Sequence, residues 1–175
     1  NTMIAEWIEN RELVTTETGE VETDAETLAA QIGLLKAIKD YGLKRVITFH
    51  SRVKRAQAFA EDISKALEVV DKRHLPKGNI RADFVSGKMS TSDRGDKLKR
   101  LKNTGSKEVS ILANARCLSE GVDVPSLDGV AFIDPKNSQV DIIQAVGRAI
   151  RLSGTKTVGT IVLPVFIQDG DDSVA

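Results

Sequence analysis

Residues 45–70 read RVITFHSRVKRAQAFAEDISKALEVV, and the rest of the chain repeats the pattern of this segment. The apolar run at residues 46–49 has the length and composition of a buried strand. Residues 53–70 then carry apolar side chains at helical spacing, with these on one side: Ala56, Phe59, Ala60, Ile63 and Leu67. A strand that runs directly into a helix predicts a parallel sheet, because parallel strands need a crossover connection.

The same alternation continues along the chain. Further short apolar runs predict buried strands at residues 82–85, 109–113, 130–133 and 159–165. Helical spacing of apolar residues predicts helices at residues 25–41, from about residue 92, and at 140–151. Strands that alternate with helices predict an α/β fold in three layers, with a parallel sheet and helices on both of its faces.

The composition narrows the possible classes of protein. The 175 residues suffice for one domain with a substantial core. Lys plus Arg number 25 and Asp plus Glu number 25, so a histone-like basic binder is excluded while a local basic face is not. Cys117 is the only cysteine, and His50 and His74 are the only histidines, so we expect neither a disulfide framework nor a metal site. No apolar run approaches the roughly 20 residues of a membrane span, and no signal peptide is evident, so a cytoplasmic protein is expected.

The chain divides into three parts. Residues 1–24 are acidic and lack apolar periodicity in their second half, which predicts a linker or surface loop. Residues 25–168 hold the predicted strands and helices and form the expected domain. Residues 169–175 are expected to be a polar tail or a truncation point.

Polar segments follow four of the predicted strands, at residues 50–52, 86–88, 114–116 and 134–136. Ligands of parallel α/β sheets bind beyond the carboxyl ends of the strands, which meet at one edge. We therefore expect these four segments to lie together at the functional edge of the sheet.

One predicted helix carries the most specific pattern. Gln144, Gly147, Arg148 and Arg151 are spaced i, i+3, i+4 and i+7, which places them on one helical face. The two guanidinium groups suit a phosphate chain. Glycine costs about 1 kcal/mol in a helix interior, which close approach of a ligand or another domain would explain. A solvated basic face with an incidental glycine is the alternative.

The spacing of residues 144–151 resembles motif VI of superfamily 2 helicases. Upstream, Gly121-Val122-Asp123-Val124-Pro125 resembles the core of motif V, and residues 46–52 resemble motif IV. Residues 85–87, followed by Arg94, resemble the stretch between motifs IV and V. The order and spacing match over residues 45–165, and residues 114–151 are most similar to restriction-associated bacterial DEAD/DEAH-type helicases. The resemblance implies the C-terminal RecA-like (P-loop NTPase-like) lobe of a helicase or translocase.

The resemblance also implies a nucleotide site shared with an N-terminal RecA-like lobe of the same full-length protein. Arg151 would be an arginine finger, and Arg148 would face the γ-phosphate, so both are candidate catalytic residues. ATP and Mg²⁺ would be bound mainly by the other lobe. The remaining candidate nucleotide-site residues are Gln144, Gly147, Gly121 and Asp123.

For nucleic acid, the resemblance implies a backbone grip, with DNA favoured over RNA. The candidate contacts are Ser51, Arg52, Gly87, and a turn at Asn114 and Ala115. Many helicases have Thr where this chain has Ala115 and Arg where it has Glu120, which puts one phosphate contact in doubt. The basic segment 88–107 is interpreted as a solvated helix face, with phosphate binding as the alternative.

The sequence lacks other parts of a complete motor. Ser86-Gly87-Lys88 fails as a P-loop, because Ala82 stands where the first glycine belongs and Met89 where Ser or Thr belongs. No acidic tetrad for Mg²⁺ occurs either. We therefore expect a piece of a longer ATP-dependent enzyme, inactive alone. The alternatives are a non-catalytic RecA-like or flavodoxin-like module that binds a nucleotide or nucleic acid, and a Rossmann enzyme, which the missing GxGxxG disfavours.

Overall fold

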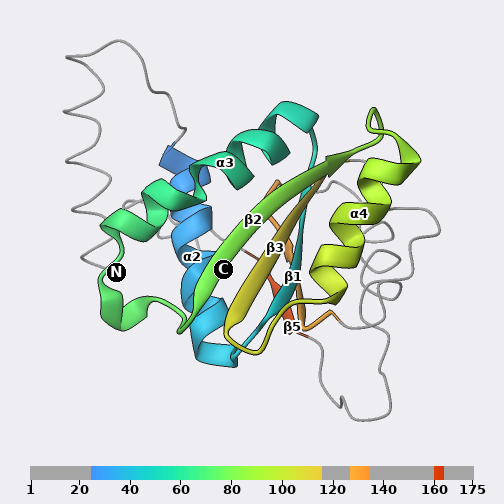
Figure 1. Cartoon of the computed structure of the whole chain (residues 1–175). Coiled ribbons are helices and arrows are strands. Elements are labelled where there is room, and N and C mark those ends of the chain that lie inside the picture. The colour runs from blue at the N-terminus through green and yellow to red at the C-terminus, as the bar shows by residue number, and fades with distance from the viewer. Residues whose placement is uncertain (1–24, 116–126, 135–159, 164–175) are drawn as a thin grey trace.

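Five parallel strands form one sheet in the order β2-β3-β1-β4-β5 (Figure 1). This computed structural model describes residues 25–115, 127–134 and 160–163, and the elements named here belong to those residues. The strands are β1 (Arg45–His50), β2 (Asn79–Ser86), β3 (Glu108–Ala115), β4 (Gly129–Phe132) and β5 (Thr160–Val162). The predicted parallel sheet is therefore confirmed.

Helices cover both faces of the sheet, as predicted (Figure 1). Helices α2 (Ala25–Tyr41) and α3 (Val53–Val69) lie on one face, and α4 (Thr91–Lys102) lies on the other. The short 3₁₀ helix η1 (Lys72–His74) follows α3. The side-chain amide of Gln31 joins α2 to α3, because its Nε2 donates to the carbonyl oxygen of Phe59 at 2.9 Å.

Successive side chains of β1 point to opposite faces of the sheet and contribute to a core on each face. Val46 packs in the cluster formed with α2 and α3, which includes Phe59. Ile47 and Phe49 point the other way and pack in a second cluster with Leu101 of α4. A strand that is apolar on both sides is expected where helices cover both faces, which is why residues 46–49 appear as a continuous apolar run.

Some predicted boundaries differ from the structure. Strand β2 begins at Asn79 rather than at residue 82, because the backbone N–H of Asn79 donates to Lys107 at 3.0 Å and pairing with β3 starts there. Strand β4 is one residue earlier than predicted, at Gly129–Phe132. Strand β5 falls inside the predicted run at 159–165. The predicted helix at 140–151 lies outside the described residues.

Two aspartates flank β4 and fasten it to opposite ends of β1. At the amino end, Asp128 Oδ2 accepts the backbone N–H groups of Lys44 at 3.2 Å and Arg45 at 2.9 Å. At the carboxyl end, Asp134 accepts hydrogen bonds from the turn that follows β1. Backbone amides bound by a carboxylate are strong, charge-assisted contacts, so the register of the central strand pair is held at both ends.

Within the part of the chain that the structure describes, no helix is long and apolar enough to cross a membrane.

Candidate nucleic-acid interface

The carboxyl ends of the strands meet at one edge of the sheet. His50 of β1 pairs with Ala115 of β3, and Ala115 pairs with Ser86 of β2, so three strands end in register. Phe49 pairs with Phe132 of β4, which brings the residues after β4 to the same edge. The predicted meeting of the polar segments is thus observed for their described members.

The turn from β1 into α3 presents cations at this edge. Ser51, Arg52 and Lys54 are exposed. Arg52 is the N-cap residue of α3 but makes no side-chain cap hydrogen bond, and the first turn of α3 contains no acidic residue. An uncapped helix N-terminus directs backbone N–H groups and a positive dipole outward. Together with the Arg52 and Lys54 side chains, this arrangement suits an anion such as a phosphate.

Asp134 binds the same turn from the neighbouring strand. Its Oδ2 accepts the N–H of Ser51 at 2.6 Å and the Ser51 hydroxyl at 2.8 Å. Its Oδ1 accepts a hydrogen bond from Nη1 of Arg55 at 2.5 Å. Burial by itself raises the pKa of Asp134, but the hydrogen bonds from Ser51 and Arg55 outweigh burial and hold the pKa below the usual value. Asp134 is therefore a carboxylate at neutral pH.

His50 belongs to the core rather than to the exposed interface. It is 4% exposed, its Nε2 lies 2.8 Å from Oγ1 of Thr48, and its ring lies 4.9 Å from that of Phe59. Burial lowers the pKa of His50 to about 4, with the Asp134 carboxylate opposing the shift and Arg55 adding to it. The imidazole is thus neutral at pH 7 and adds no charge to the edge.

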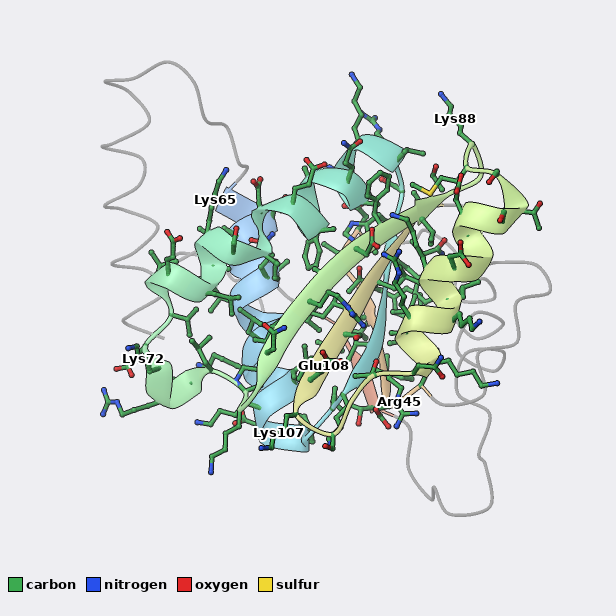
Figure 2. All side chains as sticks on the ribbon, viewed as in Figure 1. Arg45, Lys65, Lys72, Lys88, Lys107 and Glu108 are labelled. Carbon is green, nitrogen blue, oxygen red and sulfur yellow. The ribbon has the colours of Figure 1, made fainter. Side chains whose placement is uncertain are left out.

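The turn from β2 into α4 contributes the second exposed segment. Gly87 and Lys88 are exposed, and Lys88 projects from this end of the molecule (Figure 2). The turn closes through a hydrogen bond from the N–H of Met89 to the carbonyl oxygen of Ser86 at 3.1 Å. The space where a side chain at Gly87 would begin is open, so a ligand can approach the backbone there.

Asn114 and Ala115 differ from the expectation. We predicted a turn at these residues, but the structure places them as the last two residues of β3, where they are 2% and 0% exposed. Pairing with β1 and β2 on both sides extends the strand to Ala115. The predicted turn is wrong, and burial of both side chains leaves their contact with nucleic acid as a prediction without geometric support.

The candidate residues of the nucleotide site lie outside the described residues: Gly121, Asp123, Gln144, Gly147, Arg148 and Arg151. Their roles therefore stay predictions. Among the described residues, no group of three or more His, Cys, Asp or Glu side chains could hold a metal ion.

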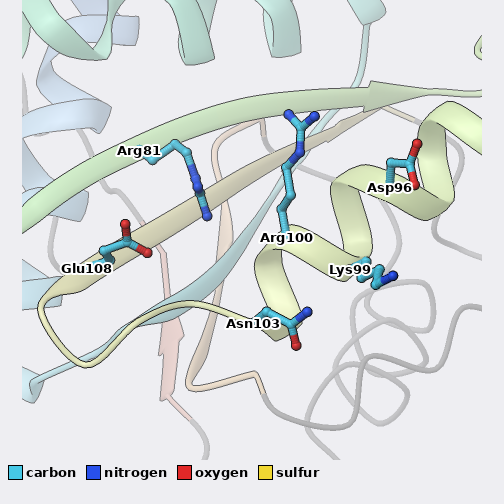
Figure 3. A pocket seen from close by; sticks show the side chains of 6 residues that line it. All are labelled: Arg81, Asp96, Lys99, Arg100, Asn103 and Glu108. Atoms are coloured by element: carbon cyan, nitrogen blue, oxygen red, sulfur yellow. The ribbon is translucent and has the colours of Figure 1, made fainter.

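A pocket of about 350 Å³ lies away from the interface, at the opposite end of the strands (Figure 3). It is lined by Arg81, Asp96, Lys99, Arg100, Asn103 and Glu108. Glu108 is the first residue of β3, whereas the candidate edge lies beyond its last residue. Cations and carboxylates are mixed in the lining, and none of the predicted site residues contributes to it. We therefore do not assign the candidate site to this pocket.

Part of the basic character of α4 has a structural role. Lys97 forms an ion pair with Asp83 of β2, and its ammonium lies 5.0 Å from the centre of the Phe84 ring. These contacts hold α4 against β2, the strand at one end of the described sheet. Lys97 is therefore engaged in packing α4 on β2, whereas Lys88 is exposed at the candidate edge. The choice between a solvated helix face and phosphate binding for segment 88–107 stays a prediction.

Two residues of this site were not selected from the sequence. Asp134 was predicted only to lie at the functional edge, and Arg55 was not singled out at all. The spacing of Ser51 and Arg55 by four residues, with a carboxylate directly after a neighbouring strand, is a signal that could have suggested the cluster. The pairing of β1 with β4, which brings them together, is not visible in the sequence.

The parallel sheet, the helices on both faces and the shared carboxyl edge define a RecA-like α/β lobe. The family model of the helicase conserved C-terminal domain matches residues 30–153, and the chain belongs to this family. Its fold is that of the C-terminal lobe of superfamily 2 helicases, as the resemblance implied.

Two curated relatives share part of the chain. The protein named "Putative helicase 22", from Sulfolobus islandicus filamentous virus, is 31% identical over 95 residues, which cover 54% of this chain and 16% of that protein. UvrABC system protein B of Clostridium perfringens is 29% identical over 104 residues, which cover 57% of this chain and 14% of that protein. The chain thus spans only a small part of the length of either relative.

Solved structures share the fold. The ATP-dependent type ISP restriction-modification enzyme LlaBIII, bound to DNA, matches with a TM-score of 0.76 and 28% identity, over 95% of this chain and 11% of that chain. Domain 2 of the DEAD-box helicase Mss116p, bound to an RNA duplex, matches with a TM-score of 0.55 and 20% identity, over 79% of this chain and 48% of that chain. The second likeness concerns the fold alone.

Proposed function

We propose that the chain is the second motor lobe of an ATP-dependent superfamily 2 helicase or DNA translocase. In this function the carboxyl edge of the sheet grips the nucleic-acid backbone, and the lobe completes an ATP site on a first RecA-like lobe. The observation that carries the first half is the β1–α3 turn, where Arg52 is exposed and makes no side-chain cap hydrogen bond, and which lies at the same edge of the sheet as the Gly87 turn.

The chemistry of this edge suits the sugar-phosphate backbone of a nucleic acid better than its bases. Backbone N–H groups and arginine or lysine side chains bind phosphate oxygens without reading sequence. Aromatic residues make up only 4% of the chain, so stacking platforms for bases are scarce. The proposed contacts are Arg52, Lys54 and the backbone at Gly87.

The nucleotide half of the proposal concerns residues outside the described part. Arg151 would donate to the γ-phosphate as negative charge develops, with Arg148 beside it. Gln144, Gly147, Gly121 and Asp123 would line the same site. ATP and Mg²⁺ would be held by the first lobe, whose P-loop and acidic residues this chain lacks.

The proposed partner is DNA. The DNA-bound LlaBIII enzyme is 28% identical to this chain, whereas the RNA-bound Mss116p domain is 20% identical. From the likeness to LlaBIII, we further propose that the protein acts in restriction-modification and that it does so in the cytoplasm.

The test of the backbone grip is equilibrium binding of the 175-residue chain to a fluorescently labelled single-stranded DNA at several salt concentrations. Arg52→Gln should weaken binding about tenfold and lower the slope of log affinity against log salt by about 0.7, the contribution of one phosphate contact on a single strand. An RNA strand of the same sequence, measured in parallel, tests the preference for DNA.

The matched control is Arg100→Gln, which removes the same charge from an exposed residue at the other end of the strands. It should keep the wild-type affinity and slope. Equal losses for Arg52→Gln and Arg100→Gln would mean that binding follows net charge alone, and the proposed interface would be rejected.

A further inference from the structure

Asp134 accepts hydrogen bonds from Ser51 and Arg55 at the β1–α3 turn. Its carboxylate receives a backbone N–H, a hydroxyl and a guanidinium, from Ser51 and Arg55, at distances between 2.5 and 2.8 Å. These are the donor types that bind a phosphate oxygen. The backbone N–H and the hydroxyl of Ser51 are therefore already engaged by a carboxylate of the protein itself.

Asp134 is also buried at this turn rather than exposed on the surface. It is 6% exposed and lies two residues beyond β4, whose pairing with β1 places it beside Ser51. Ile133, which lies between the end of β4 and Asp134, donates its N–H to the carbonyl oxygen of Phe49 at 3.1 Å and so extends the pairing toward Asp134. A buried carboxylate with three donors is costly to remove from its partners.

We infer that Asp134 is a positioning residue for the nucleic-acid grip: its carboxylate fixes the backbone at Ser51 so that Arg52 and the N-terminus of α3 face the phosphate. The inference rests on the proposed function and deepens it. Because the N–H and hydroxyl of Ser51 bind Asp134, we assign the phosphate contact to Arg52 and Lys54 rather than to Ser51.

The direction of α3 explains why the position of Ser51 matters. Ser51 immediately precedes the N-cap residue Arg52, and no side chain caps the helix. The Asp134 contacts to Ser51 and Arg55 thus hold both sides of the N-cap, one residue before it and three residues after it. Without them, Arg52 and the first-turn N–H groups would sample several directions, and ordering them on binding would cost affinity.

The chain offers a matched control in Asp128. This aspartate also binds backbone N–H groups of β1, at Lys44 and Arg45, and its Oδ2 lies 3.6 Å from Nε of Arg45. It precedes β4 as Asp134 follows it, and it acts at the amino end of β1, far along the strand from the interface. Asp128→Asn therefore removes a comparable tether without touching the β1–α3 turn.

The experiment is a double-mutant cycle on the 175-residue chain, read out as affinity for a labelled single-stranded DNA. Arg52→Gln is introduced into the wild type, into Asp134→Asn and into Asp128→Asn. We expect it to weaken binding about tenfold in the wild type and in Asp128→Asn, but only about twofold in Asp134→Asn, because there Arg52 no longer starts in the binding geometry. A purely structural role would lower the melting temperature of both aspartate variants without changing the factor for Arg52.

Each outcome decides between the two claims. A tenfold factor in the wild type and again in Asp134→Asn overturns the positioning role and leaves the proposed interface standing. A factor near one in the wild type overturns the interface and the positioning role together. If Asp134→Asn does not fold, Ser51→Ala takes its place, since it removes one of the three donors, and an unchanged tenfold factor in that variant overturns the inference.

Discussion

Burial of the His50 side chain makes the stability of the folded protein depend on pH. Its folded-state pKa is lowered from 6.5 to about 4, chiefly by burial. The folded protein therefore binds fewer protons than the unfolded chain between these pH values, and stability is lost as the pH falls. The contribution of neutral His50 is fully present above pH 6.5 and declines as the pH falls toward about 4.

We predict that the free energy of unfolding falls by about 3 kcal/mol between pH 7 and pH 4 because of His50, from a pKa difference of about 2.5 units. Urea unfolding at a series of pH values measures this slope. His50→Gln should flatten it across the same window. Asp134 loses its own contribution as the pH falls through its unfolded pKa of 3.8 and below, and the comparison with His50→Gln, which retains Asp134, separates the two effects. An unchanged slope in the variant would contradict the protonation state assigned to His50.

Substitution of alanine for glycine is predicted to change the stability in opposite directions at Gly78 and Gly33. Gly78 has a φ of 107°, and a Cβ there would lie 2.3 Å from the carbonyl oxygen of Lys107. Gly78→Ala should therefore destabilise the chain by roughly 2–4 kcal/mol, because the backbone at the start of β2 must shift. Gly33 lies inside α2 with open space around it, so Gly33→Ala should stabilise by about 0.5–1 kcal/mol.

Thermal and urea unfolding of the two alanine variants provide the comparison. The opposite signs serve as the internal control, since both variants add one methyl group. A Gly78→Ala variant as stable as the wild type would mean that the turn before β2 does not require the positive φ.

Apolar pattern was sufficient to predict most of the helices and strands of this lobe. Helix α2 has the predicted bounds, and α3 ends one residue before the predicted end. The start of β2 was missed because Asn79 and Arg81 are polar, and pairing with β3, rather than hydrophobicity, makes them strand residues. The strand order could not be predicted, since the sequence does not state which parallel strands pair. The Asp134 cluster depends on that order and was therefore missed as well.

Helix α4 begins at Thr91, one residue before the predicted start at about residue 92, and a capping interaction at Ser90 explains the difference. Ser90 Oγ accepts the N–H of Asp93 at 3.1 Å and donates to the Asp93 carboxylate at 2.7 Å. Ser90→Ala should cost about 1 kcal/mol of stability. The measurement is urea unfolding of this variant beside Ser92→Ala, an exposed serine within the same helical turn, which should stay within about 0.5 kcal/mol of the wild type. Equal effects of the two substitutions would argue against the cap.

At the scale of the whole molecule, the two halves of the proposed function rest on different support: the described geometry for the nucleic-acid grip, and the sequence motifs for the ATP site. The carboxyl edge with its β1–α3 turn supports a backbone grip, and its geometry is in the described part. The arginines that would act on ATP are placed only by the helical spacing of residues 144–151. Because an arginine finger works on a nucleotide held by another lobe, the two halves can be tested separately.

The prediction for the second half concerns a protein that carries both lobes. Arg151→Ala should lower nucleic-acid-stimulated ATP hydrolysis by about 10³-fold or more, by analogy with arginine fingers of GTPases. The guanidinium stabilises charge that develops only during phosphoryl transfer, so the loss should appear in kcat rather than in the KM for ATP. Steady-state ATPase assays with saturating DNA measure both constants, and circular dichroism checks that the variant is folded. Arg100→Ala, which removes an arginine from the pocket at the other end of the strands, is the matched control and should keep the wild-type rate. Near-normal turnover by Arg151→Ala would remove the arginine finger from the mechanism while leaving the backbone grip to be judged by Arg52 alone.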